Sequence, residues 1–357
     1  MSYLSYSPPW FLKNGLAMTL YATLSLPSFW EKTTAFSEPP YQDKIFKGAN
    51  DVPIFGWMAI PENPRGTIIG TYGITGDLDN QWFLKLLGRK AFAQGYAVIL
   101  FDWRAHGKTA LLSPTLTSDG LYEGEDFVQI AAQAKAMGCP PNFWFTGYSL
   151  GGQLALWGAK VAQNLAPELG LKETDIAGAA VICPSLESQR SLTYLVSHPL
   201  GKYLDRGISK NLRKLAWSIH DYHPGFLDPE AINRADCIWK FDEELTIELL
   251  GFSSVEDYYQ ASSALYILPQ IQKQTLIIYA EDDPLFDPTI VPDLKVTCAN
   301  NPAIDLILTR YGGHVGYIGS KSCQRRAGDP DIWWAWNRVL EWIKQHETVT
   351  LTSSINC

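Results

Sequence analysis

A short run near the middle of the chain, Gly147-Tyr148-Ser149-Leu150-Gly151, directly follows the apolar run Phe143-Trp144-Phe145-Thr146. The pattern predicts a buried strand that turns sharply around one serine and then enters a helix. Glycine is needed two residues before and two residues after the serine, because the strand and the helix approach closely there. The turn exposes the oxygen of Ser149, and the N-terminus of the following helix offers N–H groups to a developing negative charge. We therefore expect Ser149 to be a nucleophile.

Strand-like and helix-like segments alternate between residues 67 and 184 and again between residues 271 and 346. This alternation predicts an α/β fold with a mainly parallel sheet and helices on both faces. Residues 185–270 interrupt the alternation with helical pieces and no clear strand, and insertions at the carboxyl edge of such a sheet lie over its site. The expected organisation is an N-terminal extension packed on the core (1–40), an α/β core (41–184 and 271–346), a helical lid insertion (185–270) and a C-terminal tail (347–357).

The two ends of the expected core have patterns of their own. Residues 41–60 predict two antiparallel strands joined through the turn Gly48-Ala49-Asn50-Asp51. The last helix is expected to open at Asp329-Pro330-Asp331, which offers a cap residue, a proline at the first helical position and an acid in the first turn.

A serine nucleophile needs a histidine base, and the histidine needs an acid that fixes its tautomer. Among six histidines, His314 lies in the glycine-rich run Gly312–Gly316, directly after the final predicted strand. The acid should follow the preceding strand, where the chain reads Glu281-Asp282-Asp283-Pro284. We expect Asp283 to be that acid, with Asp282 as the alternative, because two adjacent acids in a turn cannot both face one histidine. Glu187, after the strand predicted at 176–183, is a weaker candidate.

Stabilising the oxyanion of an acyl-transfer reaction requires two converging N–H donors. The residue after the nucleophile, Leu150, supplies one. The second should come from the loop after the first parallel strand, Thr71–Gly76, in which Gly73 lets the backbone turn inward. We expect the amide of Ile74 to be this donor.

Other histidine motifs favour simpler explanations. The run Asp102–Gly107 contains His106 at the active edge of the sheet, and we expect a structural turn held by a salt bridge rather than a catalytic histidine. His220 and His223 lack further ligands at useful spacing, so no metal site is expected. Gly-x-Gly-x-x-Gly and Gly-x-x-x-x-Gly-Lys patterns after a strand are absent, so no nucleotide or other cofactor is expected.

Charge and cysteine usage restrict partners and compartment. The net charge is −8 and no basic cluster exists, which excludes nucleic acid as an expected partner. Six separated cysteines without a C-x-x-C pair, together with no signal-peptide pattern, favour reduced thiols in a cytoplasmic protein. The uncharged segment from Asn14 to Trp30 is too polar to span a membrane, so we expect it to pack on the protein's own surface, with weak peripheral membrane contact as the alternative.

Beyond the serine turn, the chain carries a set of short motifs: Pro8-Pro9-Trp10 with Asn14 and Thr19, Tyr72-Gly73-Ile74-Thr75-Gly76, Phe101-Asp102-x-Arg104 with His106-Gly107, Phe241-Asp242-x-x-Leu245-Thr246, Gly251-Phe252 with Tyr258-Tyr259 and Ser262, Ala280-x-Asp282-Asp283-Pro284, and Gly312–Tyr317 with Trp334. With these motifs the chain resembles the α/β-hydrolases, and within them the YheT-like hydrolases, over residues 8–345. The resemblance implies a triad of Ser149, Asp283 and His314, the same residues that the local patterns indicate. Two departures stand out: Tyr72 replaces the histidine of a His-Gly-x-x-Gly loop, which would alter the second oxyanion donor, and Leu16 and Met18 stand where the family has His and Gln.

The resemblance implies an esterase or lipase that acts on acyl esters. From the residues we expect a serine carboxylic ester hydrolase that forms an acyl-enzyme, needs no cofactor or metal, and accepts a small-molecule or lipid ester with a short to medium acyl chain. Two alternatives remain. An acyltransferase would use the same triad with an alcohol or thiol in place of water. A non-catalytic binding protein of the same fold would be expected to have lost triad residues. The sequence gives no indication of the oligomeric state.

Overall fold

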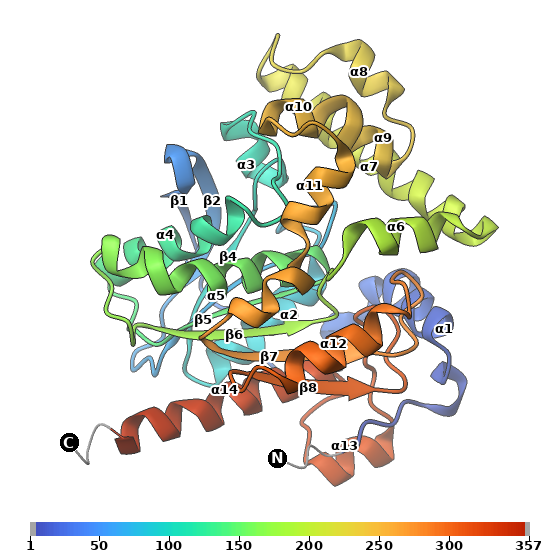
Figure 1. Cartoon of the computed structure of the whole chain (residues 1–357). Helices are drawn as coiled ribbons and strands as arrows, with labels where there is room; N and C mark the ends of the chain where they lie inside the picture. The colour runs from blue at the N-terminus through green and yellow to red at the C-terminus, as the bar shows by residue number, and fades with distance from the viewer. Residues whose placement is uncertain (1–4, 354–357) are drawn as a thin grey trace.

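A computed structural model describes residues 5–353, the last six of them by backbone alone. An eight-stranded sheet, ordered β1-β2-β4-β3-β5-β6-β7-β8, forms its centre (Figure 1). Strand β2 is antiparallel to both of its neighbours, and the six strands from β4 to β8 in this order are parallel. The expected mainly parallel sheet is confirmed. The strands are β1 (Gln42–Lys47), β2 (Pro53–Ala59), β3 (Thr67–Thr71), β4 (Ala97–Phe101), β5 (Phe143–Tyr148), β6 (Ile176–Ile182), β7 (Gln274–Ala280) and β8 (Ile304–Thr309).

Helices cover both faces of the sheet, as expected, because the central strands are apolar on both sides. On one face α4 packs on the sheet through Phe127, whose ring centroid lies 4.9 Å from that of Phe101 and 5.0 Å from that of Phe145. On the other face α2 and α14 meet through Phe83 and Trp336, with ring centroids 5.1 Å apart. The helices of the core are α2 (Trp82–Ala93), α3 (Gly107–Leu112), α4 (Glu123–Ala136), α5 (Leu150–Glu168), α12 (Ile290–Ala299), α13 (Lys321–Ala327) and α14 (Trp334–Ser353).

Between β6 and β7, a stretch that the structure describes throughout, the chain forms helices and no strand. These helices gather at the top of Figure 1, above the carboxyl side of the sheet. One cluster of buried side chains within them, which includes Leu212, Ile219 and Phe241, also takes in Ala110 and Leu116 from the core. The inserted helices are therefore packed onto the core rather than forming a separate unit. They are α6 (Ser188–Val196), α7 (Pro199–Tyr222), α8 (Pro229–Arg234), α9 (Ile238–Phe241), α10 (Ile247–Leu250) and α11 (Val255–Ser262).

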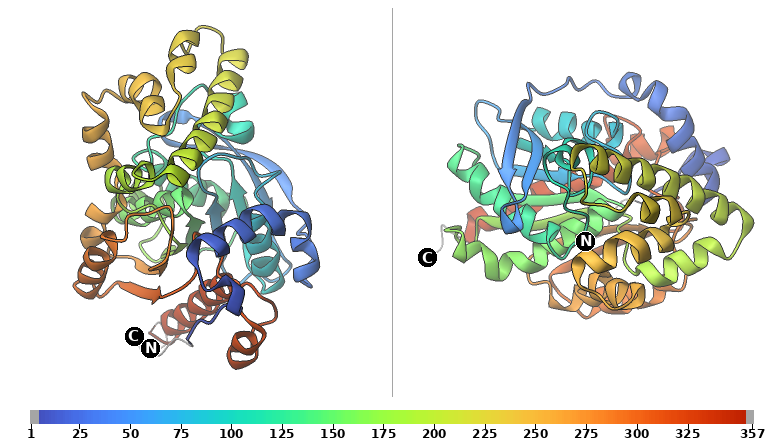
Figure 2. Two further views of the ribbon diagram at one scale, coloured as in Figure 1. Left: turned by 90° about the vertical axis from the view of Figure 1, so that its right-hand side faces the viewer. Right: turned by 90° about the horizontal axis from the view of Figure 1, so that it is seen from above.

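The N-terminal segment contains the short helix α1 (Gly15–Leu20) and several single turns. Figure 2 shows these helices lying across one side of the core, close to the C-terminal segments of the chain. Met18 and Leu26 are fully buried in the main core cluster, whereas Trp10 is 83% exposed and Leu24 75% exposed. No helix within residues 5–353 is long and apolar enough to cross a membrane.

The last helix differs from its prediction at both ends. It begins at Trp334, not at the Asp-Pro-Asp run, and it continues to Ser353, past the start of the expected tail. The two acids serve as ion-pair partners instead: Asp331 binds the ammonium of Lys90 at 2.5 Å, and Asp329 binds Arg338 within α14. These pairs hold the run as a bent, non-helical segment that leads into the helix.

Candidate active site

Ser149 lies between the end of β5 and the first residue of α5, with φ 55° and ψ −131°. A non-glycine residue in this region of φ and ψ is strained, and such strain is tolerated where the surrounding structure enforces it. The two flanking glycines make the turn possible. A Cβ on Gly147 would lie 2.3 Å from the carbonyl oxygen of Gly151, and a Cβ on Gly151 would lie 2.3 Å from that of Tyr72. Larger residues at either place would push the strand and the helix apart.

Three side chains from three loops form one hydrogen-bonded chain. The Nε2 atom of His314 lies 2.9 Å from Oγ of Ser149, and its Nδ1 atom lies 2.8 Å from Oδ2 of Asp283. The other oxygen of Asp283 accepts the N–H of Leu285 at 2.9 Å, which fixes the carboxylate. A carboxylate that accepts from Nδ1–H leaves Nε2 free to accept the hydroxyl proton of the serine. The arrangement can therefore generate a serine nucleophile.

The two other candidate acids have different partners. Asp282 accepts the N–H of Gly313 through Oδ1 at 2.9 Å, so it faces the backbone of the histidine loop rather than the imidazole. Glu187 caps α6 by accepting the N–H of Arg190. Of the three candidates, the structure brings Asp283 to the ring of His314.

The loop that carries His314 has an unusual backbone and an unexpected anchor. Gly313 (φ 58°), Val315 (φ 68°) and Tyr317 (φ 44°) all lie in the left-handed region. The backbone N–H of His314 donates to Oγ1 of Thr19, which belongs to α1. The local sequence around Thr19 predicts no role for it in the site. Thr19 appears in the sequence analysis only as one of the motif residues that carry the family resemblance.

The two residues expected to bind an oxyanion both line the cavity at Ser149. Leu150 is the first residue of α5, so its N–H has no partner within the helix. Within the described part of the chain, neither this N–H nor that of Ile74 meets an acceptor. Gly73 brings the second loop close to Ser149, since a Cβ there would lie 3.3 Å from Oγ of Ser149. Two free N–H groups in this position can stabilise negative charge on a carbonyl oxygen.

Tyr72, which stands in place of the histidine of the His-Gly-x-x-Gly loop, is fully buried. Its hydroxyl donates to Oδ1 of Asp102 at 2.6 Å, and the same oxygen accepts the N–H of Leu78 at 2.9 Å. Burial raises the pKa of Asp102 to about 6, against the opposing effect of these hydrogen bonds. The tyrosine thus ties the start of the oxyanion loop to the end of β4.

His106 supports the same loop from the other side. Its Nε2 accepts the N–H of Thr75 at 3.2 Å, so the proton resides on Nδ1, which donates to the carbonyl of Arg104 at 2.9 Å. The ring stacks on Trp103 with centroids 3.6 Å apart. Burial lowers the pKa of His106 to about 4, so the imidazole is neutral at pH 7. The expected salt bridge of this turn is present as a two-pronged contact of Arg104 with Asp126 at 2.7 and 2.8 Å.

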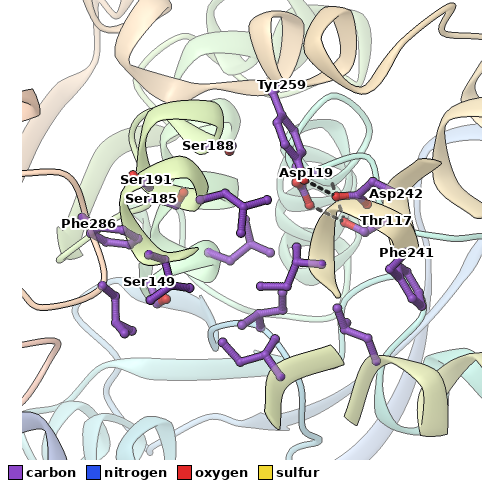
Figure 3. Close-up of a pocket in the computed structure, with 18 of the residues that line it drawn as sticks. Thr117, Asp119, Ser149, Ser185, Ser188, Ser191, Phe241, Asp242, Tyr259 and Phe286 are labelled. Carbon is purple, nitrogen blue, oxygen red and sulfur yellow. Dashed lines mark hydrogen bonds between the residues drawn. The ribbon is translucent and has the colours of Figure 1, made fainter. Parts of the chain in front are cut away.

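A largely apolar cavity opens at Ser149 (Figure 3). Its walls come from the loop after β3, the start of α5, the inserted helices and the loop after β7. Residues of α6, α7 and α9 contribute, so the insertion forms part of the wall of this cavity. The apolar lining consists of Ile74, Trp103, Leu150, Leu192, Leu195, Ile208, Leu212, Ile238, Phe241, Leu285 and Phe286.

Two acids lie in the wall of the cavity away from Ser149, as Figure 3 shows. Asp242 accepts the hydroxyl of Tyr259 at 2.6 Å, and Asp119 accepts that of Thr117 at 3.3 Å. Burial raises the pKa of Asp242 to about 6 and that of Asp119 to about 8. This upward shift of the pKa favours the uncharged form of Asp119, which reduces the cost of placing an apolar group nearby.

The described residues contain no group of three or more His, Cys, Asp or Glu side chains that could hold a metal ion. His220 and His223 each hydrogen-bond to a backbone carbonyl, that of Leu227 and that of Ala110. The five cysteines within the described range are all unpaired, and Cys357 lies outside it.

Comparison with known proteins agrees with this architecture. Residues 75–320 match a model described as the alpha/beta hydrolase family. The chain is 53% identical over 348 residues to a Synechocystis sp. protein named "Putative esterase slr0264", covering 95% of this chain and 94% of that protein.

Two further comparisons are more distant. An Escherichia coli protein named "Putative esterase YheT" is 30% identical over 203 residues, or 55% of this chain and 53% of that protein. Among solved structures, the Pyrococcus furiosus esterase Pf2001 superposes with a TM-score of 0.54 at 18% identity, covering 87% of this chain and 93% of that one. The latter likeness is one of fold alone.

Proposed function

The chain belongs to the α/β-hydrolase family, and from this membership and the site geometry we propose that it is a serine esterase that cleaves carboxylic esters through an acyl-enzyme. One observation carries the proposal. The imidazole of His314 lies within hydrogen-bond distance of both a strained, half-buried serine and a fixed carboxylate. The names of the relatives from Synechocystis sp. and Escherichia coli, both of which contain the word esterase, agree with this proposal.

In the proposed reaction Oγ of Ser149 attacks the ester carbonyl while Nε2 of His314 takes its proton. The tetrahedral oxyanion is held by the N–H groups of Leu150 and Ile74. Its collapse breaks the bond to the leaving alkoxide, which receives the proton from His314 as the alcohol departs. Water then attacks the acyl-enzyme with the same histidine as base, and Ser149 is regenerated with release of the acid. Asp283 stabilises the imidazolium in both halves and itself stays ionised.

The cavity favours an acyl ester with a short to medium chain. Eleven apolar side chains line it, and the cavity lining contains no lysine or arginine that would select an anionic substrate. Asp119 and Asp242 lie where the apolar lining ends and polar groups begin. Once an acyl chain is long enough to reach them, further methylenes should add no binding free energy.

We expect kcat/KM to rise with acyl length and then level off. Each methylene buried in the cavity contributes ~0.8 kcal/mol, close to fourfold in binding. The measurement is the slope of log(kcat/KM) for p-nitrophenyl esters from acetyl to decanoyl, with Leu212→Ala as a variant that should move the plateau to longer chains. A flat or falling slope would assign the site to a small polar ester instead.

Product analysis on the same panel separates hydrolysis from acyl transfer. In the presence of an added alcohol, a hydrolase releases mainly the free acid, whereas an acyltransferase would release mainly the new ester. A serine-directed phosphonate run beside the panel reports whether Ser149 is activated even where no tested ester is turned over.

We propose in addition that the exposed apolar side chains of the N-terminal segment make weak contact with lipid. Trp10 is 83% exposed and Leu24 75% exposed. Removing two such side chains should weaken binding by ~10²-fold or more, since each buried side chain contributes ~1.5–3 kcal/mol. The measurement is co-sedimentation of a Trp10→Ser/Leu24→Ser variant with phosphatidylcholine vesicles. Val296→Ser, which removes an apolar side chain 62% exposed on α12, is the control. If the same fraction of both variants and of the wild type co-sediments with the vesicles, the proposed lipid contact is wrong.

A further inference from the structure

We infer that Thr19 is a positioning residue for the histidine of the site, so that helix α1 completes the active site from outside the core. The inference rests on the proposed function in one respect: it takes His314 to be the base for Ser149. Thr19 touches no reacting atom. It acts on the backbone of the loop that carries the imidazole.

The hydroxyl of Thr19 is held on both sides. It donates to the carbonyl oxygen of Gly15, one turn earlier in α1, at 2.8 Å. With its proton committed there, the oxygen accepts the backbone N–H of His314, also at 2.8 Å. Thr19 is 8% exposed, so water cannot readily replace it as the acceptor. Linked hydrogen bonds in such a buried place reinforce one another.

Close packing presses the same helix against the loop. A Cβ on Gly313 would lie 2.5 Å from the carbonyl oxygen of Gly15 and 2.8 Å from the hydroxyl of Thr19. A Cβ on Gly316 would lie 2.6 Å from the side chain of Met18, which is fully buried. The helix also touches the acid turn, since a Cβ on Gly15 would lie 1.6 Å from the carbonyl oxygen of Asp282. Residues 15–19 therefore pack against both turns that flank the imidazole.

The loop needs this support because its own backbone is strained. Three of its residues after Gly312 have left-handed φ values, each at a cost of order 1–3 kcal/mol where the residue is not glycine. Within the described residues, Thr19 is the acceptor for the N–H of His314. Loss of that acceptor leaves a buried N–H unpaired and frees the loop to relax. A shift of ~1 Å in a reacting group can cost ~10²-fold in rate.

The test compares Thr19→Val with Thr19→Ser. Valine keeps the shape and removes the acceptor, whereas serine restores the acceptor. We expect Thr19→Val to lower kcat by ~10- to 100-fold with little change in KM, and Thr19→Ser to remain within about threefold of the wild type. The selective loss of kcat and its rescue by serine are what a merely structural role would not produce.

Thr23→Val is the matched control. Its hydroxyl also donates to a backbone carbonyl one turn earlier, that of Thr19, at 2.9 Å, but accepts nothing from the loop. We expect this variant to keep the wild-type kcat. A folded Thr19→Val enzyme with wild-type kcat would overturn the inference, and so would an equal loss in Thr23→Val.

The rate of phosphonate labelling at Ser149 separates this inference from the proposed function. Slow labelling in Thr19→Val, together with no turnover of any ester by the wild type, would leave the inference standing and sink the esterase proposal. Should Thr19→Val fail to fold, Gly15→Ala carries the same test, because its Cβ displaces α1 from Asp282 without removing a hydrogen-bonding side chain. Wild-type labelling by a folded Gly15→Ala protein would also overturn the inference.

Discussion

Ser149→Ala should lower kcat for ester hydrolysis by ~10⁶ while the protein keeps its fold. Alanine removes the attacking oxygen and nothing else, because Oγ of Ser149 is bonded only to Nε2 of His314 among the contacts that the structure describes. A residual rate of ~10³–10⁴ over water should survive, since the oxyanion donors and the cavity remain. The measurement is kcat on the preferred ester, with circular dichroism to confirm folding.

Ser185→Ala is the natural control for this experiment. Ser185 lines the same cavity, but among the described residues it makes no hydrogen bond to His314. Its substitution should leave kcat within a few-fold of the wild type. Mass spectrometry of phosphonate-labelled protein should find the adduct at position 149, and an adduct at any other serine would contradict the assignment.

The second large effect separates two adjacent acids. Asp283→Asn should lower kcat by ~10⁴, because an amide beside Nδ1 favours the tautomer whose Nε2 carries the proton and cannot accept one from the serine. Asp282→Asn should cost far less. Its side-chain oxygen accepts the N–H of Gly313, and an asparagine oxygen can do the same. The reverse ranking would show that Asp282 is the partner of the histidine during turnover.

Most of the fold could be predicted because local patterns and tertiary packing agree. Buried parallel strands read as short apolar runs, and the strand predicted at 176–183 matches β6 (Ile176–Ile182) to within one residue. The strand-to-helix turn was readable for the same reason: Gly147 and Gly151 are required by contacts within a few residues of them. Patterns of this kind depend only on near neighbours in the chain.

The features that escaped prediction depend on distant partners. The run Asp329-Pro330-Asp331 has the local chemistry of a helix start. In the structure, however, Asp331 forms an ion pair with Lys90 and Asp329 forms one with Arg338. In the site, the roles of Tyr72 and Thr19 follow from hydrogen bonds across 30 and 295 residues. A single sequence carries no signal of such pairings, because a buried tyrosine or threonine has many possible acceptors and donors.

The contact between Thr19 and His314 also determines the order in which parts of the site can form during synthesis of the chain. The two residues are 295 positions apart, and a ribosome adding ~5–20 residues per second needs ~15–60 s to pass from one to the other. The turn at Ser149 can form in the growing chain before the proposed base, His314, has been made, and the loop of His314 is held only when α1 docks onto it. A nascent chain that stops short of His314 therefore lacks the proposed base, however much of its sheet has already formed.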